Sequence, residues 1–274
     1  MKLIAEIGWN HIGNMDLAKK LIIAAAESGA EYCKFQTWSE KKLCAGSWDN
    51  DGRREIYKKA ELTKEKHHEL FDFCNENKTN FLTTVFNIDD VEFLSKINNK
   101  IIKIGSPEVY NKDLIKKCLD NFETVLLSTG ASKWQEIEEL KNFEKINKLI
   151  LFHCVSSYPC IADNVNILRM NELKKITSEV GYSGHYDGIE DAIIALCNGA
   201  TYIEKHFTID KNLPGRDNKF AILPEQFQLL SNFRDKFKIM NKNKGLDLQE
   251  CEYDTYKNAR GRWSGRNNNK TQKL

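Results

Sequence analysis

The sequence predicts a single (β/α)8 TIM barrel of the α/β class with a polar C-terminal tail. Short β-rich runs alternate with amphipathic helical patterns from residue 2 to residue 240. Strict alternation implies parallel strands joined by right-handed crossovers, and eight strand–helix units fit a barrel of about 250 residues. An open doubly wound sheet is the alternative, but "GWNHIGN" matches its usual GxGxxG loop poorly. We therefore favour the barrel.

Each expected strand precedes an expected helix. The first helical pattern, "MDLAKKLIIAAAESGA", has apolar residues at helical spacing and ends at Gly29, a usual helix stop. Several later patterns begin with Asp, Asn or Ser, which cap helix N-termini, and 223–240 is the last. The expected strands are 2–8, 32–38, 80–86, 101–106, 124–130, 149–155, 180–185 and 201–208.

Two segments depart from this alternation. Residues 39–63 form a long insertion after the second strand, on the side of a barrel where active sites lie. Long loops there are usually lids or binding loops. Residues 241–274 are polar and basic, as in a solvated chain end. We therefore assign 1–240 to the catalytic barrel and 241–274 to a tail.

Composition excludes several classes of protein. The 41 Lys and Arg nearly balance the 39 Asp and Glu, which argues against the one-sided basic surface of a nucleic-acid-binding protein. No apolar run is long enough to span a membrane, and the start lacks a signal-peptide core. The eight Cys include no CxxC pair. We expect a cytoplasmic protein with reduced cysteines and no membrane partner.

Polar residues gather where the expected strands end, which is where barrel chemistry lies. The pairs 34/36, 183/185 and 204/206 are two residues apart, so each pair shares one strand face. If that face points into the lumen, these side chains surround a common space. The residues are Glu6, Asn10, His11, Lys34, Gln36, Thr84, Lys103, Ser106, Glu108, Ser128, Ser156, Tyr158, Ser183, His185, Glu204 and His206.

Simpler explanations remain open for some of them. Buried lysines are costly unless paired, so Lys34 and Lys103 could serve only as ion-pair partners of Glu6, Glu108 or Glu204. Taken alone, the serine of "STG" shapes a turn. His153 is expected to be a satisfied core histidine, and both His67 and His68 are expected to face solvent at the start of a helix.

His185 and His206 indicate a metal site. They end the seventh and eighth strands, which are neighbours about 4.8 Å apart. Two imidazoles there can reach one divalent cation, with water or substrate completing its shell. The lysines and the hydroxyls beside them suit an anion that bears phosphate and carboxylate. A metal beside that anion suits polarisation of a carbonyl.

Several phrases of the sequence resemble the sialic acid synthase family. They are "IAEIGWNHIGN", "AAAESGAEYCKFQT", "KIGSPE", "LLSTG", "LFHCVSSYP", "GYSGH", "GATYIEKHFT" and "PGRDNK", in order from about residue 2 to 235. Members of that family condense phosphoenolpyruvate with N-acetylmannosamine or a related aldose. Close relatives make legionaminic or pseudaminic acid.

The resemblance implies a role for each matching residue. His185 and His206 would bind the divalent metal, manganese or magnesium. Glu6 and Glu108 match acids near the reacting centre, Tyr158 and Asp217 would contact the sugar, and Ser156 stands where an Asn is common. The phosphoenolpyruvate-binding set would be Lys34, Thr84, Lys103, Ser106, Ser128, Ser156 and Ser183.

The implied reaction joins C3 of phosphoenolpyruvate to the open-chain aldehyde carbon, which the metal polarises. The oxocarbenium at C2 then takes up water, with Glu6 or Glu108 as general base. Collapse of the tetrahedral intermediate breaks its C–O bond and releases phosphate. Lysines stabilise the phosphate charge throughout.

Departures from the family bear on the sugar. From the resemblance we expect the usual C-terminal antifreeze-like domain, which lends an Arg to a partner's site, to be absent. That leaves a homodimer, a separate lid chain, or replacement by Arg216 or the 39–63 loop as alternatives. Gly184 stands where an Asp is common, and "TTVFN" replaces a more usual "STPF". These changes, together with Ser156, either retune the sugar site or mark decay. We carry three hypotheses: this synthase, the same chemistry on another aldose, and a catalytically silent barrel that binds a partner.

Overall fold

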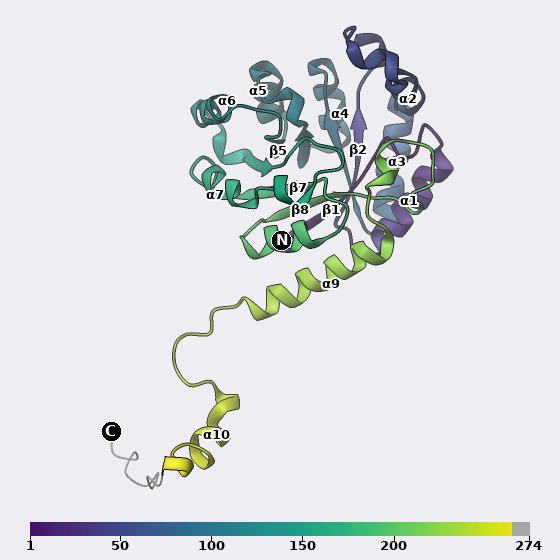
Figure 1. Cartoon of the computed structure of the whole chain (residues 1–274). Helices are drawn as coiled ribbons and strands as arrows, with labels where there is room; N and C mark the ends of the chain where they lie inside the picture. Colours follow the sequence, from purple (N-terminus) through teal and green to yellow (C-terminus); the bar gives the residue numbers. More distant parts are fainter. Residues whose placement is uncertain (265–274) are drawn as a thin grey trace. The chain divides into compact units, whose positions relative to one another are not determined.

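The computed structural model describes residues 1–264 and confirms the predicted barrel (Figure 1). Eight parallel strands pair in chain order, and the last pairs with the first. The strands are β1 (Lys2–Gly8), β2 (Tyr32–Thr37), β3 (Asn80–Val85), β4 (Ile101–Ile104), β5 (Thr124–Ser128), β6 (Leu149–His153), β7 (Val180–Gly184) and β8 (Tyr202–His206).

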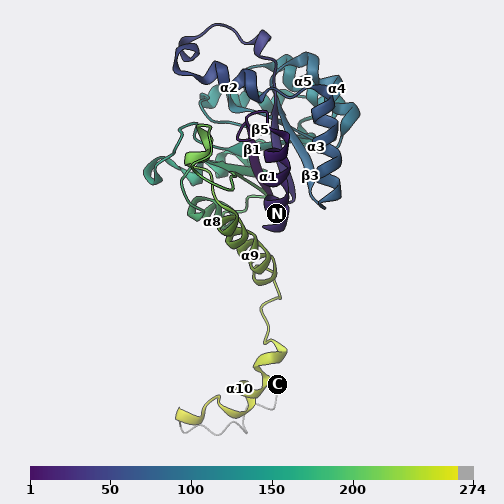
Figure 2. The same cartoon turned by 90° about the vertical axis from the view of Figure 1, so that its right-hand side faces the viewer.

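Helices surround the strands of the barrel (Figures 1 and 2). The first begins behind Asn14, whose side chain accepts a hydrogen bond from the Leu17 N–H, as an N-cap does. The helices of the barrel are α1 (Met15–Glu27), α2 (Arg53–Ala60), α3 (Lys64–Glu76), α4 (Val91–Ile97), α5 (Lys112–Asn121), α6 (Trp134–Glu138), α7 (Met170–Leu173), α8 (Glu190–Cys197) and α9 (Pro224–Met240).

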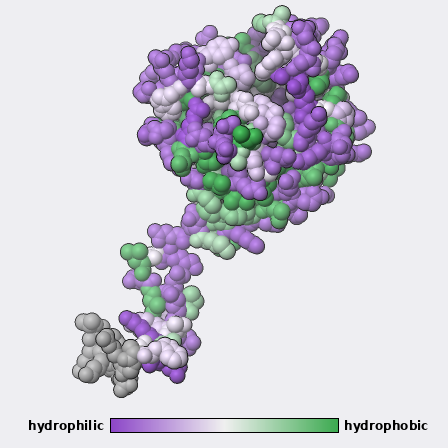
Figure 3. Space-filling view, in the orientation of Figure 1, coloured by the Kyte–Doolittle hydropathy of each residue, from purple (hydrophilic) through white to green (hydrophobic). Residues whose placement is uncertain are grey.

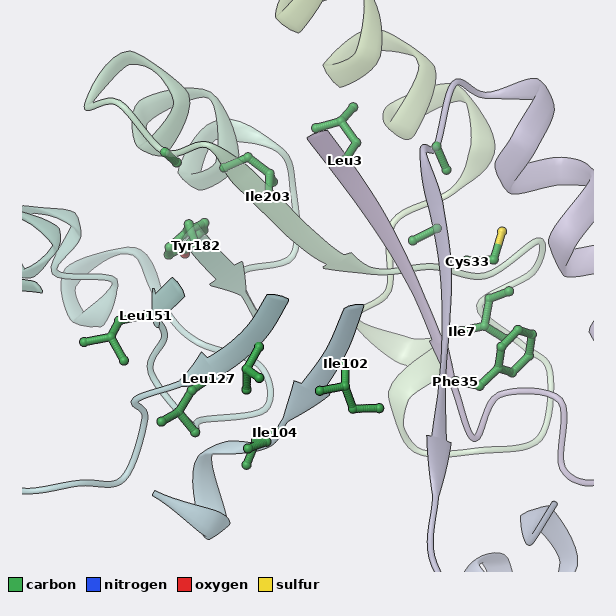
Figure 4. Packing of buried hydrophobic residues seen from close by; sticks show 14 of the residues in the cluster. Leu3, Ile7, Cys33, Phe35, Ile102, Ile104, Leu127, Leu151, Tyr182 and Ile203 are labelled. Atoms are coloured by element: carbon green, nitrogen blue, oxygen red, sulfur yellow. The ribbon is translucent and has the colours of Figure 1, made fainter. Parts of the chain in front are cut away.

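Alternation along each strand sorts side chains into two cores. Outward residues such as Leu3, Phe35 and Ile203 pack under the helices in one large cluster (Figure 4). A second, smaller cluster includes Ile4 and Tyr202, each offset by one residue from the outward set. This inner apolar layer fills the amino-terminal end of the lumen, so the barrel is packed there and the polar positions are left to the other end.

The 39–63 insertion is folded against the barrel and contains α2. The indole N–H of Trp38 donates to the Tyr57 carbonyl at 3.1 Å. The Tyr57 ring stacks on Trp9, which follows β1, with ring centroids 5.0 Å apart. In Figure 2, α2 lies at the end of the barrel away from the N-terminus. The insertion therefore lies on the side where the sequence predicts the site.

His67 corrects one expectation. Its ring is buried in α3, where the two nitrogens contact Thr37 Oγ1 and the Thr63 carbonyl, each at 2.8 Å. Leu70, one turn further on, is buried as well, so position 67 belongs to the inner face of the helix. The prediction that His67 faces solvent is wrong, whereas His68 is exposed.

The chain divides into two compact units, Met1–Phe237 and a second unit that begins at Lys238. The second unit contains α10 (Tyr253–Asn258) and exposes Tyr253 and Trp263. The predicted tail falls in this unit, and its residues 265–274 lie outside the described residues. Polar side chains cover most of the barrel face shown in Figure 3. None of the described helices is long and apolar enough to cross a membrane.

Candidate active site

A ring of buried polar side chains lies above the inner apolar layer. Six of the seven members occupy the inward position that follows an apolar inward residue on their strand, as Glu6 follows Ile4 and Glu204 follows Tyr202. The seventh, Ser183, follows Gly181. All are at most 5% exposed. The ring comprises Glu6, Lys34, Thr84, Lys103, Ser128, Ser183 and Glu204. Strand alternation thus brings the predicted residues of seven strands together.

Lys34 forms one centre of this ring. Its ammonium lies 2.8 Å from Glu6 Oε2 and donates to Thr84 Oγ1 at 2.7 Å. The same nitrogen is 3.7 Å from Glu204 Oε1, so Lys34 lies between the two carboxylates. Gln36 donates to the other Glu6 oxygen at 2.5 Å. The Glu6 carboxylate is therefore held on both sides.

Glu204 and Lys103 form the second centre. Lys103 Nζ donates to Glu204 Oε2 at 2.9 Å, and Ser183 Oγ donates to Oε1 at 3.0 Å. The Lys103 ammonium also lies 4.0 Å from the centre of the Phe152 ring. Within residues 1–264 it makes one hydrogen bond, although an ammonium has three N–H groups. Two of its donors are available to a ligand.

The two glutamates have opposite electrostatic settings. Burial raises the pKa of Glu6 to about 7, against the pull of Lys34 and with a further rise from the Glu204 charge. Burial also disfavours ionisation of Glu204, but Lys103 and Lys34 overcome it and lower its pKa to about 2. Glu204 is therefore a fixed negative charge, whereas Glu6 can exchange a proton near neutral pH.

The two lysines also differ. Burial lowers the pKa of Lys103, with partial compensation from Glu204. Burial acts on Lys34 in the same direction, but Glu204 and Glu6 outweigh it and raise its pKa. The ion pairs with Glu6 and Glu204 are those that the simpler explanation expected. They neutralise the lysines while leaving Lys103 donors unused.

A second polar group lies beside the ring, at the ends of β4 to β6. Ser106 Oγ is 3.0 Å from Cys154 Sγ and accepts from the Gly130 N–H at 3.1 Å. A Cβ at Gly130 would lie 2.3 Å from Ser156 Oγ and 2.5 Å from Cys154 Sγ. Glycine at 130 thus lets the predicted Ser106 and Ser156 approach each other. The Ser128 hydroxyl has no hydrogen-bond partner among residues 1–264.

His185 and His206 meet at the mouth of the lumen. Their ring centroids are 5.4 Å apart, and the Tyr158 ring lies 4.2 Å from His185. His185 Nδ1 contacts the Val155 carbonyl at 2.7 Å, which assigns the proton to Nδ1 and leaves Nε2 as an acceptor. The Phe220 ring packs against the His206 ring, with ring centroids 5.0 Å apart.

These histidines have the chemistry of metal ligands. Burial lowers the pKa of His185 to about 4, and burial with the neighbouring His185 lowers that of His206 well below its usual value. Both rings are therefore neutral, and His206 Nδ1 is buried without a hydrogen-bond partner. In the described part of the chain no three His, Cys, Asp or Glu side chains converge as a metal-binding group. The donor set fits a cation with two protein ligands and an otherwise open shell.

Asp217 completes the mouth. Its carboxylate lies 3.4 Å from His206 Nδ1, and burial raises its pKa to about 6, partly offset by the Trp9 side chain. The neighbouring Arg216 forms an ion pair with Asp51 of the insertion at 3.1 Å. The predicted sugar residues, Tyr158 and Asp217, thus flank the two histidines.

Glu108 lies apart from the ring. It is half-buried in a short 3-10 turn after β4 and accepts from the Asn111 side chain at 2.8 Å. Among the described residues no hydrogen bond or ion pair joins it to Lys34, Lys103 or Glu6. The two predicted catalytic acids are therefore not equivalent.

Gly184 faces the outer side of the barrel rather than the lumen. A Cβ there would lie 2.2 Å from Asp191 Oδ2, 2.7 Å from the Tyr182 ring and 3.1 Å from Lys205 Cδ. These groups belong to the outer face of the barrel, because position 184 alternates with the inward Ser183. A side chain at position 184 would therefore not border the mouth of the lumen, where the predicted sugar residues lie.

Cys154 was not predicted as a site residue, and Glu204 was predicted to line the lumen without a role in substrate binding or catalysis. Glu204 stands two residues before His206 and Cys154 two residues after Phe152, so strand alternation places both in the lumen. That signal was present for both. What alternation cannot show is that Glu204 pairs with both lysines.

Comparisons with known proteins show the family of this chain. A model of the NeuB family matches residues 21–245. The chain is 36% identical to the N,N'-diacetyllegionaminic acid synthase of Campylobacter jejuni subsp. jejuni serotype O:2, over 83% of this chain and 73% of that protein. It is 31% identical to the pseudaminic acid synthase of Helicobacter pylori, over 81% and 69%.

A solved structure extends the likeness to three dimensions. The N-acetylneuraminic acid synthetase of Leptospira borgpetersenii serovar Hardjo-bovis, crystallised with citrate, superposes with a TM-score of 0.85 at 30% identity. The match covers 96% of this chain and 92% of that one. Fold, sequence and family model agree, and the chain belongs to the NeuB family.

Proposed function

We propose that this protein condenses phosphoenolpyruvate with an N-acetylated aldose, N-acetylmannosamine or a related deoxy sugar. The products are a sialic or other nonulosonic acid and phosphate. Relatives named as legionaminic and pseudaminic acid synthases support this reaction class. The observation that carries the proposal is the pair of buried lysines in the lumen, one of which has unused donors.

The ring of buried polar side chains that contains Lys34 and Lys103, called the lysine ring below, would hold phosphoenolpyruvate. Lys103 has N–H groups to give to the phosphate or carboxylate, and Lys34 adds a second fixed positive charge. The hydroxyls of Ser128 and Ser106 lie on the same side of the barrel as donors to the remaining oxygens. Anion binding there is favourable because fixed charges act strongly in a dry site.

The mouth would hold the sugar. A divalent cation, Mn2+ or Mg2+, held by His185 and His206, would supply Lewis acidity for the sugar carbonyl. Tyr158 offers an exposed aromatic face, and Asp217 offers a carboxylate for hydroxyl or amide groups. The acceptor would thus lie above the phosphoenolpyruvate bound deeper in the lumen.

The proposed reaction forms one C–C bond and breaks one C–O bond. The C3–C4 bond forms between phosphoenolpyruvate and the aldehyde carbon, and the aldehyde oxygen gains a proton. Water adds to C2 and its proton passes to a base, for which ionised Glu6 has a suitable pKa of about 7. The C2–O bond to phosphate then breaks while the C2 hydroxyl becomes the ketone carbonyl and its proton passes to the departing phosphate. The lysines stabilise the charge of that phosphate.

Phosphate release from phosphoenolpyruvate with Mn2+, across a panel of N-acetylated hexoses and 6-deoxyhexoses, tests the proposal. Release that requires one sugar, and that disappears with a chelator and in His206→Ala, supports the synthase and names the aldose. Phosphoenolpyruvate binding without turnover on any sugar contradicts the synthase and favours the silent barrel. Absence of phosphoenolpyruvate binding contradicts the site.

A further inference from the structure

A third buried lysine–carboxylate pair lies on the outer face of the barrel, under α8. Lys205 of β8 and Asp191 of α8 have side chains that are each 1% exposed, and their charged atoms are 2.9 Å apart. Neither side chain points into the lumen, because Lys205 alternates with the inward Glu204 and His206. The pair is separate from the lysine ring described above.

All the N–H donors of the Lys205 ammonium are engaged within the protein. The Lys205 ammonium donates to the Tyr186 carbonyl at 2.7 Å and to the two Asp191 oxygens at 3.1 and 2.9 Å. Asp191 also accepts from the Tyr182 hydroxyl at 2.9 Å and from the Ala192 N–H at 2.8 Å. All three ammonium donors have partners, so nothing is left for a ligand.

These bonds hold the two chain segments that carry the histidines. Tyr186, whose carbonyl accepts from Lys205, directly follows His185, and Lys205 directly precedes His206. His185 is held from its other side through Nδ1 and the Val155 carbonyl at 2.7 Å. The Asp191–Lys205 pair therefore connects the end of β7 to the end of β8 directly behind the histidine pair.

Gly184 is what makes room for the Asp191 carboxylate. A Cβ at 184 would lie 2.2 Å from Asp191 Oδ2, so the carboxylate occupies the volume of a side chain at that position. Gly184 is not among the positive-φ glycines, so its backbone accepts other residues. A carboxylate placed on residue 184 would reach the same Lys205 ammonium.

We infer that Asp191 is a positioning residue for His185 and His206, and that positions 184 and 191 are alternative sources of one carboxylate. A carboxylate at either position satisfies Lys205, whereas carboxylates at both collide and repel. The stability part of this inference is independent of the proposed function. The part that concerns metal affinity rests on it.

A double-mutant cycle tests the coupling of the two positions. Asp191→Ala leaves Lys205 buried and uncompensated, and we expect a thermal midpoint lower by about 10 °C. Gly184→Asp alone should also lower the midpoint. Gly184→Asp with Asp191→Ala should recover at least half of the Asp191→Ala loss. The matched control, Gly184→Ala with Asp191→Ala, fills the space without the charge and should recover little.

The NMR signals of the two histidine rings provide a second measurement, which would not change if Asp191 only stabilised the fold. At temperatures well below the thermal midpoint of each variant, where the protein is folded, Asp191→Ala should shift the ring signals of His185 and His206 in a 1H–13C NMR spectrum. The relocated carboxylate should return them toward their wild-type positions. Asp191→Asn, a milder change, should give the same shifts if Asp191→Ala does not fold. Mn2+ affinity should fall about tenfold or more in either variant.

Two results would overturn the inference. A double variant no more stable than its alanine control would mean that residue 184 cannot replace Asp191. Unmoved ring signals in folded Asp191→Ala or Asp191→Asn would reduce Asp191 to a stabilising residue. If the wild type does not bind Mn2+, the proposed function fails, whereas the stability cycle and the ring signals still decide the inference.

Discussion

Each end of the barrel buries a cationic side chain, and the two side chains differ in how many of their hydrogen-bond donors are used. At the carboxyl end, the Lys103 ammonium makes one hydrogen bond, to Glu204, among residues 1–264. At the amino end, the Arg234 guanidinium of α9 donates to Glu31, Gly29, Ser231 and Asp235. Five guanidinium donors meet this set of acceptors, which leaves none for a ligand.

The acceptor of Arg234 is also part of the scaffold. Glu31 accepts from the Leu3 N–H at 2.7 Å, just where β1 begins. Arg234 thereby connects the last barrel helix to the first two strands. The comparison shows that a buried charge does not by itself identify a functional site. Unused hydrogen-bonding capacity at the carboxyl ends of the strands does so better.

Replacing these two cationic side chains should give the largest effects, on catalysis in one case and on stability in the other. Lys103→Met removes donors aimed at the anion, and we expect kcat/KM for phosphoenolpyruvate to fall about a thousandfold. Arg234→Met should leave kcat/KM of the folded protein unchanged. It should lower the free energy of unfolding by about 2–4 kcal/mol, because Glu31 loses its partner. Steady-state kinetics and urea denaturation on both variants measure the contrast.

Buried histidines offer a second contrast. Among residues 1–264, His206 Nδ1 has no hydrogen-bond partner, whereas both ring nitrogens of His67 have one. His206→Ala should weaken Mn2+ binding at least a hundredfold, because a ligand is lost. His67→Ala should leave Mn2+ affinity unchanged and lower stability instead. Titration of Mn2+ followed by electron paramagnetic resonance decides; equal losses in both variants would contradict the metal assignment.

The pH profile sharpens the role of Glu6. A base must be ionised, so with a pKa of about 7 the wild-type kcat/KM should rise through that pH and then level. Glu6→Gln should lose about a hundredfold in rate together with this limb.

The same carboxyl predicts a dependence of stability on pH. The pKa of the Glu6 carboxyl is about 7 in the folded protein, against an ordinary value of 4.5 in the unfolded chain. Between these two pH values the folded protein keeps a proton that the unfolded chain has released. The contribution of Glu6 to stability therefore falls as pH rises across that window. Urea midpoints of Glu6→Gln should depend less on pH there; an unchanged dependence would contradict the pKa assignment.

Glu108 should give the smallest effect. Because its carboxylate contacts Asn111 rather than the lysine ring, Glu108→Gln should reduce kcat less than about tenfold. The measurement is kcat beside that of Glu6→Gln under identical conditions. A larger loss for Glu108→Gln than for Glu6→Gln would reverse the order of the two acids.

Much of the fold could be predicted from the sequence because strand and helix periods alternate without interruption. The expected strand 2–8 matches β1, and 101–106 overruns β4 (Ile101–Ile104) by two residues. Parallel strands in a closed barrel share one functional end, so alternation alone brings Lys34, Thr84 and Lys103 together.

Contacts between elements were harder to predict. His67 is buried because α3 turns that face to β2 and β3, and a single polar residue on a helix gives no sign of this. Gly184 lies against Asp191, whose position depends on how α8 packs. Glu108 follows its strand in a 3-10 turn, where strand alternation no longer applies.

Calorimetric titration of phosphoenolpyruvate into the wild type, Lys103→Met and Arg234→Met tests the central claim most directly. The unused donors of Lys103 predict that Arg234→Met binds phosphoenolpyruvate as the wild type does. They also predict that Lys103→Met binds at least a hundredfold more weakly. Wild-type affinity in folded Lys103→Met would contradict the assignment of the lysine ring as the anion site.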